Sequence, residues 1–155
     1  MNRILVIDDD KAVLNYLMVF LTQTRRFEVG VLSDSTKSFE MIDSGNFNLI
    51  LLDMDMPEVT GKQVLQYVRE HHPEIEVVIL TGVEDVELAV ESMKMGVYDY
   101  LCKPVDNNRL LLILERALER SQLRNEVIQL RDQVRLEGVK YKEAFKKIIT
   151  QDKNL

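Results

Sequence analysis

The sequence predicts an α/β domain with a doubly wound, five-stranded parallel sheet, followed by a helical extension. Short runs rich in Val, Ile and Leu alternate with longer segments in which apolar residues recur every three or four positions. Within the short runs the apolar residues are nearly continuous, as expected for strands that are covered on both faces. Strands that alternate with helices in this way form parallel sheets with helices on both sides.

Five apolar runs are expected to be the strands, because they are short and rich in branched side chains. They are Ile4–Ile7, Phe27–Leu32, Leu49–Leu52, Val77–Leu80 and Tyr98–Cys102. The segments between them are expected to be helices. These are Lys11–Thr24, Ser35–Ser44, Lys62–Glu70 and Glu84–Met95. Gly45 and Gly96 are expected to end the second and the fourth helix, since glycine is common just after a helix.

A fifth helix is expected from Asn107 onward, and nothing in the sequence ends it at the usual length. Its apolar face consists of Leu110, Leu111, Ile113, Leu114, Ala117 and Leu118. Beyond this face, Leu123, Val127, Leu130 and Val134 recur at the 4-3-4 spacing of a two-stranded coiled coil. We therefore expect a domain over residues 1–120, a helical linker over residues 121–155, and a homodimer through Asn108–Leu136. A helix that folds back onto its own domain is the alternative.

Composition narrows the class of protein. Residues 1–120 carry a net charge of −9 and residues 121–155 a net charge of +3. An acidic domain is a poor partner for nucleic acid, so direct nucleic-acid binding by this chain is not expected. No apolar run approaches the length needed to cross a bilayer, and the N-terminus lacks a signal segment. The single Cys102 cannot form an intramolecular disulfide and fits a reducing compartment, so a cytoplasmic protein is expected.

Polar residues follow four of the predicted strands. Asp8, Asp9 and Asp10 follow the first strand, Asp53 and Asp55 the third, Thr81 the fourth and Lys103 the fifth. In a parallel sheet these positions meet beyond the carboxyl ends of the strands. Clustered carboxylates repel one another unless a cation lies among them, and oxygen ligands alone favour a hard ion such as Mg²⁺.

Two other polar groups have simpler explanations. Asp10 directly precedes the first helix and is expected to be its N-cap. His71 and His72 lie near the end of the third helix, where capping or solvent exposure is expected in preference to metal binding.

The motifs ILVIDDD, LILLDMDMP followed by TG, VVILTG and YDYLCKP together resemble the receiver domain of two-component response regulators over about residues 1–120. The resemblance implies a sheet order of 2-1-3-4-5 with five helices. It implies that Asp53 is the phosphoacceptor, and that Asp8, Asp9, Asp53 and the backbone carbonyl of Asp55 hold Mg²⁺ or Mn²⁺. Thr81 and Lys103 match the residues that contact the phosphoryl group, and Tyr100 matches the aromatic switch position.

A receiver domain is a signalling domain, and its partner is a sensor histidine kinase or a phosphotransfer protein. The resemblance implies that the phosphoryl group draws Thr81 inward and that Tyr100 then turns into the vacated space. Asp55 and Val83 depart mildly from the family pattern and are expected to tune the lifetime of the aspartyl-phosphate. Gly61 is expected to adopt a positive φ in the loop after Asp53.

Two other functions are consistent with parts of the pattern. A haloacid-dehalogenase-like phosphatase also has an Asp-x-Asp loop, which Asp53-Met54-Asp55 satisfies, but that family carries it on the first strand and has more chain to follow. A receiver-shaped interaction module that never accepts phosphate would not require the acids, Thr81 and Lys103 together.

The helical linker indicates which class of output domain to expect. A receiver followed by a long helix resembles nitrogen-regulator-type (NtrC-like) transcriptional activators, in which an ATPase and a DNA-binding domain follow. The segment AFKKIITQDKNL resembles the approach to that ATPase, so the chain is expected to be truncated before an output domain that regulates transcription. A cyclic-dinucleotide phosphodiesterase output is the alternative.

Overall fold

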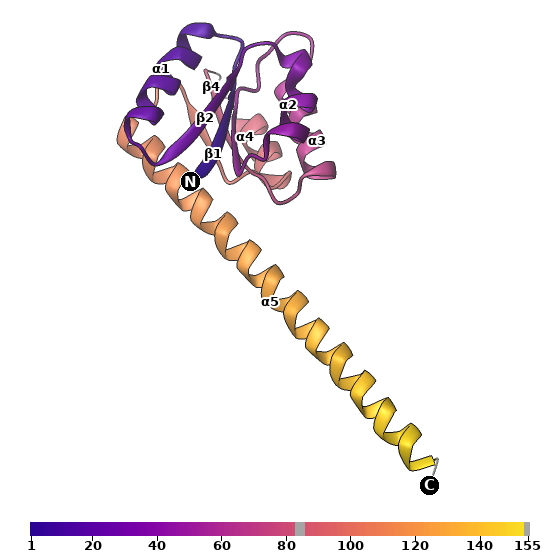
Figure 1. The fold of residues 1–155 in the computed structure, drawn as a ribbon. Coiled ribbons are helices and arrows are strands. Elements are labelled where there is room, and N and C mark those ends of the chain that lie inside the picture. Colours follow the sequence, from indigo (N-terminus) through magenta and orange to yellow (C-terminus); the bar gives the residue numbers. More distant parts are fainter. Residues whose placement is uncertain (83–85, 154–155) are drawn as a thin grey trace. The chain divides into compact units, whose positions relative to one another are not determined.

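The computed structural model describes residues 1–82 and 86–153 and has the predicted five-stranded parallel sheet (Figure 1). The strands are β1 (Asn2–Ile7), β2 (Phe27–Leu32), β3 (Leu49–Leu52), β4 (Glu76–Thr81) and β5 (Asp99–Cys102). They lie in the order β2-β1-β3-β4-β5, and every neighbouring pair is parallel. The fold class and the strand order are therefore confirmed.

Helices cover both faces of this sheet (Figure 1). They are α1 (Lys11–Gln23), α2 (Ser38–Gly45), α3 (Gly61–His71), α4 (Val86–Lys94) and α5 (Asn107–Lys153). Buried residues of α1 and of the first turns of α5 share one core layer, and those of α2 and α3 share the other. Successive residues of a strand point to opposite faces, so Ile4 and Val6 enter the first layer and Leu5 and Ile7 the second. Both faces being covered explains why the strands are uniformly apolar.

The second predicted helix is wrong in its first turn. Ser35–Lys37 forms a short 3₁₀ helix, and the α-helix begins only at Ser38. Asp34 caps the 3₁₀ turn by accepting a hydrogen bond from the backbone N–H of Thr36. Gly45 is the last helical residue rather than the residue that ends the helix, because the left-handed conformation falls on Asn46 with φ of 52°. Gly96, with φ of 82°, follows α4 as expected.

Side chains fix the starts of α1 and α3. The Asp10 carboxylate accepts hydrogen bonds from the backbone N–H groups of Ala12 and Val13, which confirms Asp10 as the N-cap. Thr60 and Gln63 form a capping box that starts α3 one residue before the predicted Lys62. The predicted start of the fourth helix at Glu84 lies outside the described residues.

The two histidines make contacts at the end of α3. The His72 Nε2 atom lies 2.7 Å from Asp43 Oδ1, and the His71 ring stacks on Tyr67 with centroids 4.2 Å apart. Both side chains therefore have local structural roles.

Backbone contacts divide the chain into two units, Met1–Ser121 and Gln122–Leu155. In the second unit the described chain is helical as far as Lys153. Its predicted seam residues are exposed in this single chain: Leu123, Val127, Leu130 and Val134. Among the described residues no helix is both long and apolar enough to cross a membrane.

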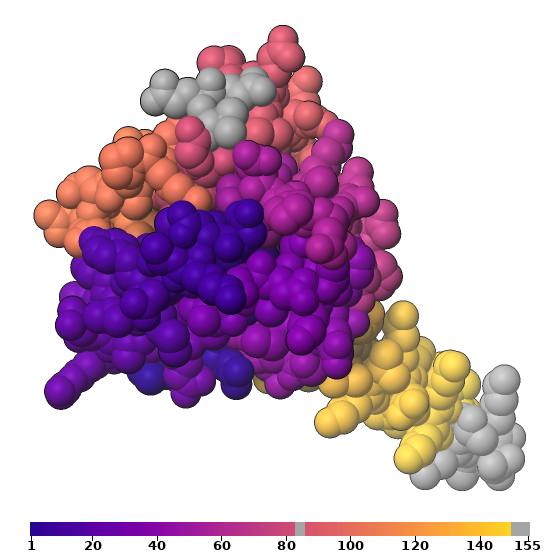
Figure 2. Space-filling view, turned by 90° about the horizontal axis from the view of Figure 1, so that it is seen from above, coloured from indigo at the N-terminus to yellow at the C-terminus, as the bar shows by residue number. Residues whose placement is uncertain are grey.

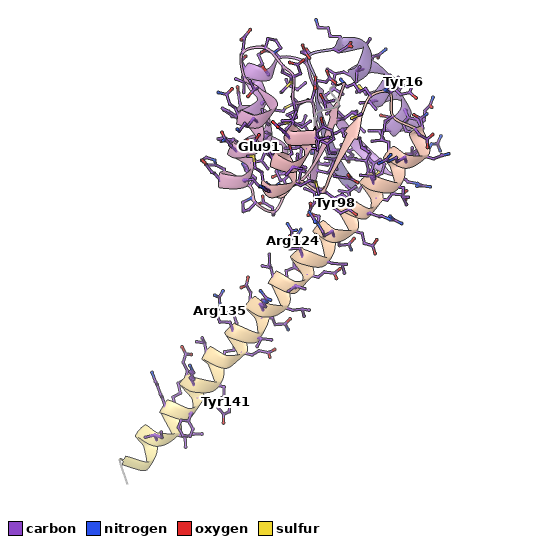
Figure 3. The ribbon with its side chains drawn as sticks, turned by 180° about the vertical axis from the view of Figure 1, so that it is seen from behind. Tyr16, Glu91, Tyr98, Arg124, Arg135 and Tyr141 are labelled. Carbon is purple, nitrogen blue, oxygen red and sulfur yellow. The ribbon has the colours of Figure 1, made fainter. Side chains whose placement is uncertain are left out.

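A buried acid at the amino-terminal ends of the strands was not predicted from the sequence. Glu76, the first residue of β4, is fully buried, and Arg120 Nε donates a hydrogen bond of 3.1 Å to its Oε1 atom. The Arg120 guanidinium also lies 4.8 Å from the centre of the Tyr98 ring, beside α5 (Figure 3). This cluster holds the last turn of α5 within the first unit against the start of β4 and against Tyr98, which directly precedes β5.

We expect Arg120→Ala to lower the free energy of unfolding by on the order of 3 kcal/mol, because the Glu76 carboxylate would lose its charged partner while staying buried. Arg116→Ala, on an exposed position of the same helix, should change it by less than about 0.5 kcal/mol. Urea denaturation of both variants measures the difference. Equal effects of the two substitutions would contradict this role of the Glu76–Arg120 pair.

Candidate functional site

The sheet register places Asp8 and Asp53 side by side. Ile7 of β1 pairs with Leu52 of β3, and each strand ends at that residue. The next residues are the two aspartates, and the Asp53 N–H donates a 2.9 Å hydrogen bond to the Ile7 carbonyl. The Asp8 N–H is held by the Leu32 carbonyl of β2 at 3.2 Å. Ladder hydrogen bonds therefore fix both acids at one edge of the sheet.

Thr81 and Lys103 reach the same edge from β4 and β5. Thr81 is the last residue of β4, and its carbonyl accepts a 2.7 Å hydrogen bond from the Lys103 N–H. The peptide bond between Lys103 and Pro104 is cis.

These residues line one open hollow of about 440 Å³. Its lining consists of Asp8, Asp9, Asp10, Asp53, Asp55, Thr81, Gly82 and Lys103. Figure 2 looks onto this edge, where the indigo beginning of the chain meets the orange segment that follows β5. The predicted convergence of the four strand ends is confirmed.

Burial differs sharply among the acids. The Asp8 and Asp53 residues are 2% and 5% exposed, whereas Asp9 and Asp55 are exposed. The Lys103 ammonium lies 2.6 Å from Asp8 Oδ2 and 3.8 Å from Asp53 Oδ2. In this state the lysine therefore pairs mainly with Asp8 and leaves Asp53 with the weaker contact.

Burial, and to a lesser extent the nearby Asp8 charge, raise the pKa of the Asp53 carboxyl, which is about 6 once all its neighbours are counted. The Asp55 N–H, which donates a 3.2 Å hydrogen bond to Asp53 Oδ1, lowers this pKa, as do Lys103 and the Thr81 hydroxyl. Desolvation outweighs these three groups. The ionised form of Asp53 is therefore short of positive charge, and a bound cation would supply it.

The acids fit a hard divalent ion. One carboxylate oxygen from each of Asp8, Asp9 and Asp53 lies within 4.8 Å of the others. Ligands on opposite sides of Mg²⁺ are roughly 4.2 Å apart, since each lies about 2.1 Å from the ion. The three oxygens can therefore share one ion with little movement, and the all-oxygen donor set suits Mg²⁺ or Mn²⁺. The Asp55 carbonyl stays a predicted ligand.

Gly61 supports Asp53 in a way that differs from the prediction. It is the first residue of α3, and a Cβ atom there would lie 2.5 Å from the Asp53 carbonyl oxygen. Close approach therefore requires glycine, whereas the positive φ in this loop, 64°, falls on Glu58.

The predicted switch position lies on β5. Tyr100 is half-buried and packs against the core layer that contains α2 and α3. Val83, expected to tune the phosphoryl lifetime, lies outside the described residues.

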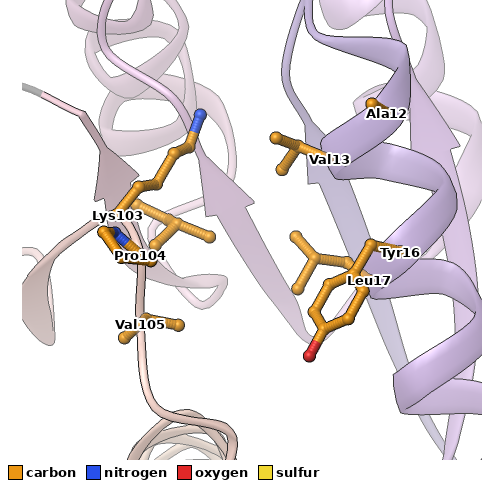
Figure 4. Close-up of a pocket in the computed structure, with 8 residues that line it drawn as sticks. Ala12, Val13, Tyr16, Leu17, Lys103, Pro104 and Val105 are labelled. Atoms are coloured by element: carbon orange, nitrogen blue, oxygen red, sulfur yellow. The ribbon is translucent and has the colours of Figure 1, made fainter.

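A second hollow, of about 500 Å³, lies between α1 and the loop after β5 (Figure 4). Ala12, Val13, Tyr16 and Leu17 form one wall, and Lys103, Pro104 and Val105 form the other. It shares Lys103 with the acidic hollow but is lined mainly by apolar side chains. This hollow was not predicted from the sequence, because its walls are separated by about 90 residues and meet only in the fold.

Comparison with known proteins identifies the family. The model of the family described as "response regulator receiver domain" matches residues 4–115 of this chain. An NtrX-like response regulator from Rickettsia typhi is 32% identical over 84% of this chain and 28% of its own length. The nitrogen assimilation regulatory protein NtrX from Azorhizobium caulinodans is 32% identical over 83% of this chain and 28% of its own length. This chain therefore spans little more than a quarter of these curated relatives.

A solved structure agrees. The crystal structure of NtrX from Brucella abortus superposes with a TM-score of 0.76 at 32% identity, over 84% of this chain and 29% of that one.

We expect metal-free protein to lose stability as pH rises between about 4 and 7. The pKa of Asp53 is about 6 in the folded chain against 3.8 for the free group, so the folded state binds this proton more tightly. Asp53→Asn should raise the free energy of unfolding at pH 7.5 in EDTA by on the order of 2 kcal/mol. Asp55→Asn, at an exposed side chain, is the control and should change little. Denaturation that is insensitive to Asp53→Asn across this pH range would refute the shift.

Proposed function

The chain belongs to the response regulator receiver domain family, and we propose from this membership that Asp53 accepts a phosphoryl group from the phosphohistidine of a sensor kinase or phosphotransfer protein. The observation that carries the proposal is the arrangement around Asp53. Two further acids can share a cation with it, and the Lys103 ammonium lies 3.8 Å from its Oδ2 atom. Receiver domains bind Mg²⁺ at an acidic pocket of this kind.

The transfer step follows from these contacts. An Asp53 carboxylate oxygen forms the new P–O bond while the P–N bond to the donor imidazole breaks, and the imidazole nitrogen keeps the electron pair of that bond. A carboxylate is a weak nucleophile, so the rate depends on position and on neutralised charge. Mg²⁺ bound by Asp8, Asp9, Asp53 and the Asp55 carbonyl would supply positive charge toward the phosphoryl oxygens. The Asp55 N–H, bonded to Asp53 Oδ1, leaves Oδ2 on the side of Lys103.

Lys103 and Thr81 then respond to the added charge. The Lys103 ammonium, now 2.6 Å from Asp8, would shift toward the phosphoryl oxygens as the cation takes over the neutralisation of Asp8. The Thr81 hydroxyl would turn its hydrogen bond from the carboxylate to a phosphoryl oxygen. A shift of Thr81 toward the phosphoryl group would let Tyr100 change its packing, so that local charge would select between two arrangements of α4 and β5.

Partner and output complete the proposal. The apolar groove between α1 and Lys103–Val105 opens next to Asp53's hollow, where a helix carrying the donor histidine would dock. Similarity to NtrX proteins supports transcription regulation as the output. Further domains would exert it, since those relatives are more than three times as long as the matched region. A homodimer through Asn108–Leu136 would transmit the conformational change of the receiver domain to the output. The proposed location of the protein is the cytoplasm.

We expect Asp53→Asn and Asp53→Ala to abolish labelling by acetyl phosphate in the presence of Mg²⁺, because the proposal assigns the phosphoryl group to the Asp53 carboxylate alone. Asp55→Asn serves as the matched control and should still be labelled. Phosphoprotein gel mobility and intact mass measure the product. Full labelling of Asp53→Ala would overturn the assignment, and continuous turnover of p-nitrophenyl phosphate would favour the phosphatase alternative instead of a single phosphorylation per chain.

A tryptophan probe tests the switch. The sequence has no tryptophan, so Tyr100→Trp introduces a single reporter. Its emission should shift when beryllofluoride and Mg²⁺ are added, because the ring changes its surroundings. Tyr67→Trp, at a half-buried ring on α3, should report no change. Identical responses of the two probes, or none from Tyr100→Trp, would remove Tyr100 from the mechanism.

A further inference from the structure

A buried serine outside the acidic hollow contacts the loop that follows Asp53. Ser35 is the first residue of the 3₁₀ turn that precedes α2, and it is 5% exposed. Its hydroxyl donates a 2.8 Å hydrogen bond to the Pro57 carbonyl and accepts one of 3.3 Å from the Val59 N–H. Among the described residues no other side chain hydrogen-bonds to the backbone of residues 56–59. One hydroxyl group therefore ties the loop between β3 and α3 to the segment before α2.

The two hydrogen bonds enclose the strained residue of this loop. Glu58 lies between Pro57 and Val59 and has φ of 64°, a conformation that residues other than glycine rarely adopt. A hydroxyl can donate one hydrogen bond and accept another, so Ser35 satisfies the carbonyl before Glu58 and the N–H after it. Such a conformation persists only where its surroundings hold it. The Ser35 hydroxyl therefore stabilises the turn at Glu58.

This turn lies close in sequence to the acidic site. The Asp55 N–H donates a 3.2 Å hydrogen bond to Asp53 Oδ1, which fixes one side of the Asp55 peptide. On the other side, Met56 is 5% exposed and belongs to the core layer of α2 and α3. Pro57 restricts its own φ and the conformation of Met56. Ser35, by holding the Pro57 carbonyl, therefore limits how far the Asp55 peptide can rotate.

We propose that Ser35 is a positioning residue for the metal site, which fixes the direction of the Asp55 carbonyl without touching the ion. The inference rests on the proposed function, in which this carbonyl and three carboxylates bind Mg²⁺. Mg²⁺ demands near-ideal octahedral geometry, so a misdirected ligand weakens binding. A carboxylate can adjust by rotating its own side chain, whereas the direction of a backbone carbonyl depends on the loop that carries it.

The local sequence also supplies a matched control. The Asp34 carboxylate accepts hydrogen bonds from the Thr36 N–H and from the Thr36 hydroxyl, at 3.1 and 2.6 Å, and so caps the 3₁₀ turn that begins at Ser35. Ser38, three residues further on, begins α2 and is fully buried. Its hydroxyl has no hydrogen-bond partner in the part of the chain that the structure describes. Two buried serines of one segment therefore differ in whether their hydroxyl holds the loop.

Magnesium titration of the full 155-residue chain tests the proposal. Ser35→Ala should raise the Mg²⁺ dissociation constant, measured by isothermal titration calorimetry, by about fivefold, the factor that corresponds to one lost hydrogen bond. Ser38→Ala removes a buried hydroxyl that holds nothing and should change the constant by less than about twofold. Ser35→Cys keeps the shape with a weaker hydrogen-bonding group, so it should give a smaller rise. It provides the same test if Ser35→Ala does not fold.

Two further measurements separate positioning from simple stabilisation. The amide hydrogen of Val59 should exchange with solvent faster in metal-free Ser35→Ala than in the wild-type chain, as followed by NMR. In acetyl phosphate labelling of Ser35→Ala, the Mg²⁺ concentration that gives the half-maximal rate should rise by the same factor as the dissociation constant. The rate at saturating Mg²⁺ should change less, because the ion then holds the carbonyl in place.

The outcomes distinguish this inference from the proposed function. A Ser35→Ala chain that is less stable in urea but binds Mg²⁺ as the wild type does would reduce Ser35 to a structural role and overturn the proposal. Equal losses of affinity in Ser35→Ala and Ser38→Ala, or unchanged exchange at Val59, would also overturn it. In each of these cases labelling of the wild type at Asp53 would leave the proposed function standing. A wild-type chain that neither binds Mg²⁺ nor is labelled would overturn both.

Discussion

Two acids buried side by side at the tips of β1 and β3 are the constraint on which the site depends. Asp8 and Asp53 are almost fully removed from water, and one ammonium group, that of Lys103, lies within 4 Å of both. Like charges in a poorly solvated place repel strongly. The pKa of Asp53 is raised to about 6, mainly by burial and also by the Asp8 charge, so the ionised carboxylate lacks compensating positive charge. A bound cation could neutralise these carboxylates. The Lys103 ammonium could then move from Asp8 toward Asp53.

The backbone is built to keep those acids where they are. The β1–β3 register and the hydrogen bond from Asp53 N–H to Ile7 leave the acids no freedom to separate. Gly61 lets the start of α3 press against the Asp53 backbone, a contact that any larger residue would displace. Burying the two acids therefore destabilises the fold locally. Burial of the apolar layers on both sides of the sheet offsets this cost.

Much of this could be predicted from sequence because it follows from period and chain order. Uniformly apolar strands alternating with helices require a parallel sheet, and a parallel sheet brings Asp8, Asp53, Thr81 and Lys103 to one edge. The Glu76–Arg120 pair escaped prediction for the opposite reason. A glutamate before an apolar run is usually a solvated strand end, whereas this one is fully buried and paired with Arg120 of α5. The apolar groove beside α1 likewise depends on residues far apart in sequence, and Asn46 rather than Gly45 ends α2 because asparagine also tolerates the left-handed region.

The periodicity of α5 shows how one helix can serve two partners. Its buried residues in the first unit include Leu110, Leu114, Ala117 and Ser121, at 4-3-4 spacing. Continued, that spacing leads to Arg124 and Ile128, whereas the exposed seam falls one residue earlier, on Leu123 and Val127. One residue corresponds to about 100° of rotation, so the seam is a different face from the core stripe. Pairing with a second copy therefore does not compete with packing of α5 on its own sheet. Phosphorylation of Asp53 would consequently act by changing how the first turns of α5 pack on the sheet. It would not need to release side chains from the sheet for use in the dimer, because the two contacts use different faces of α5.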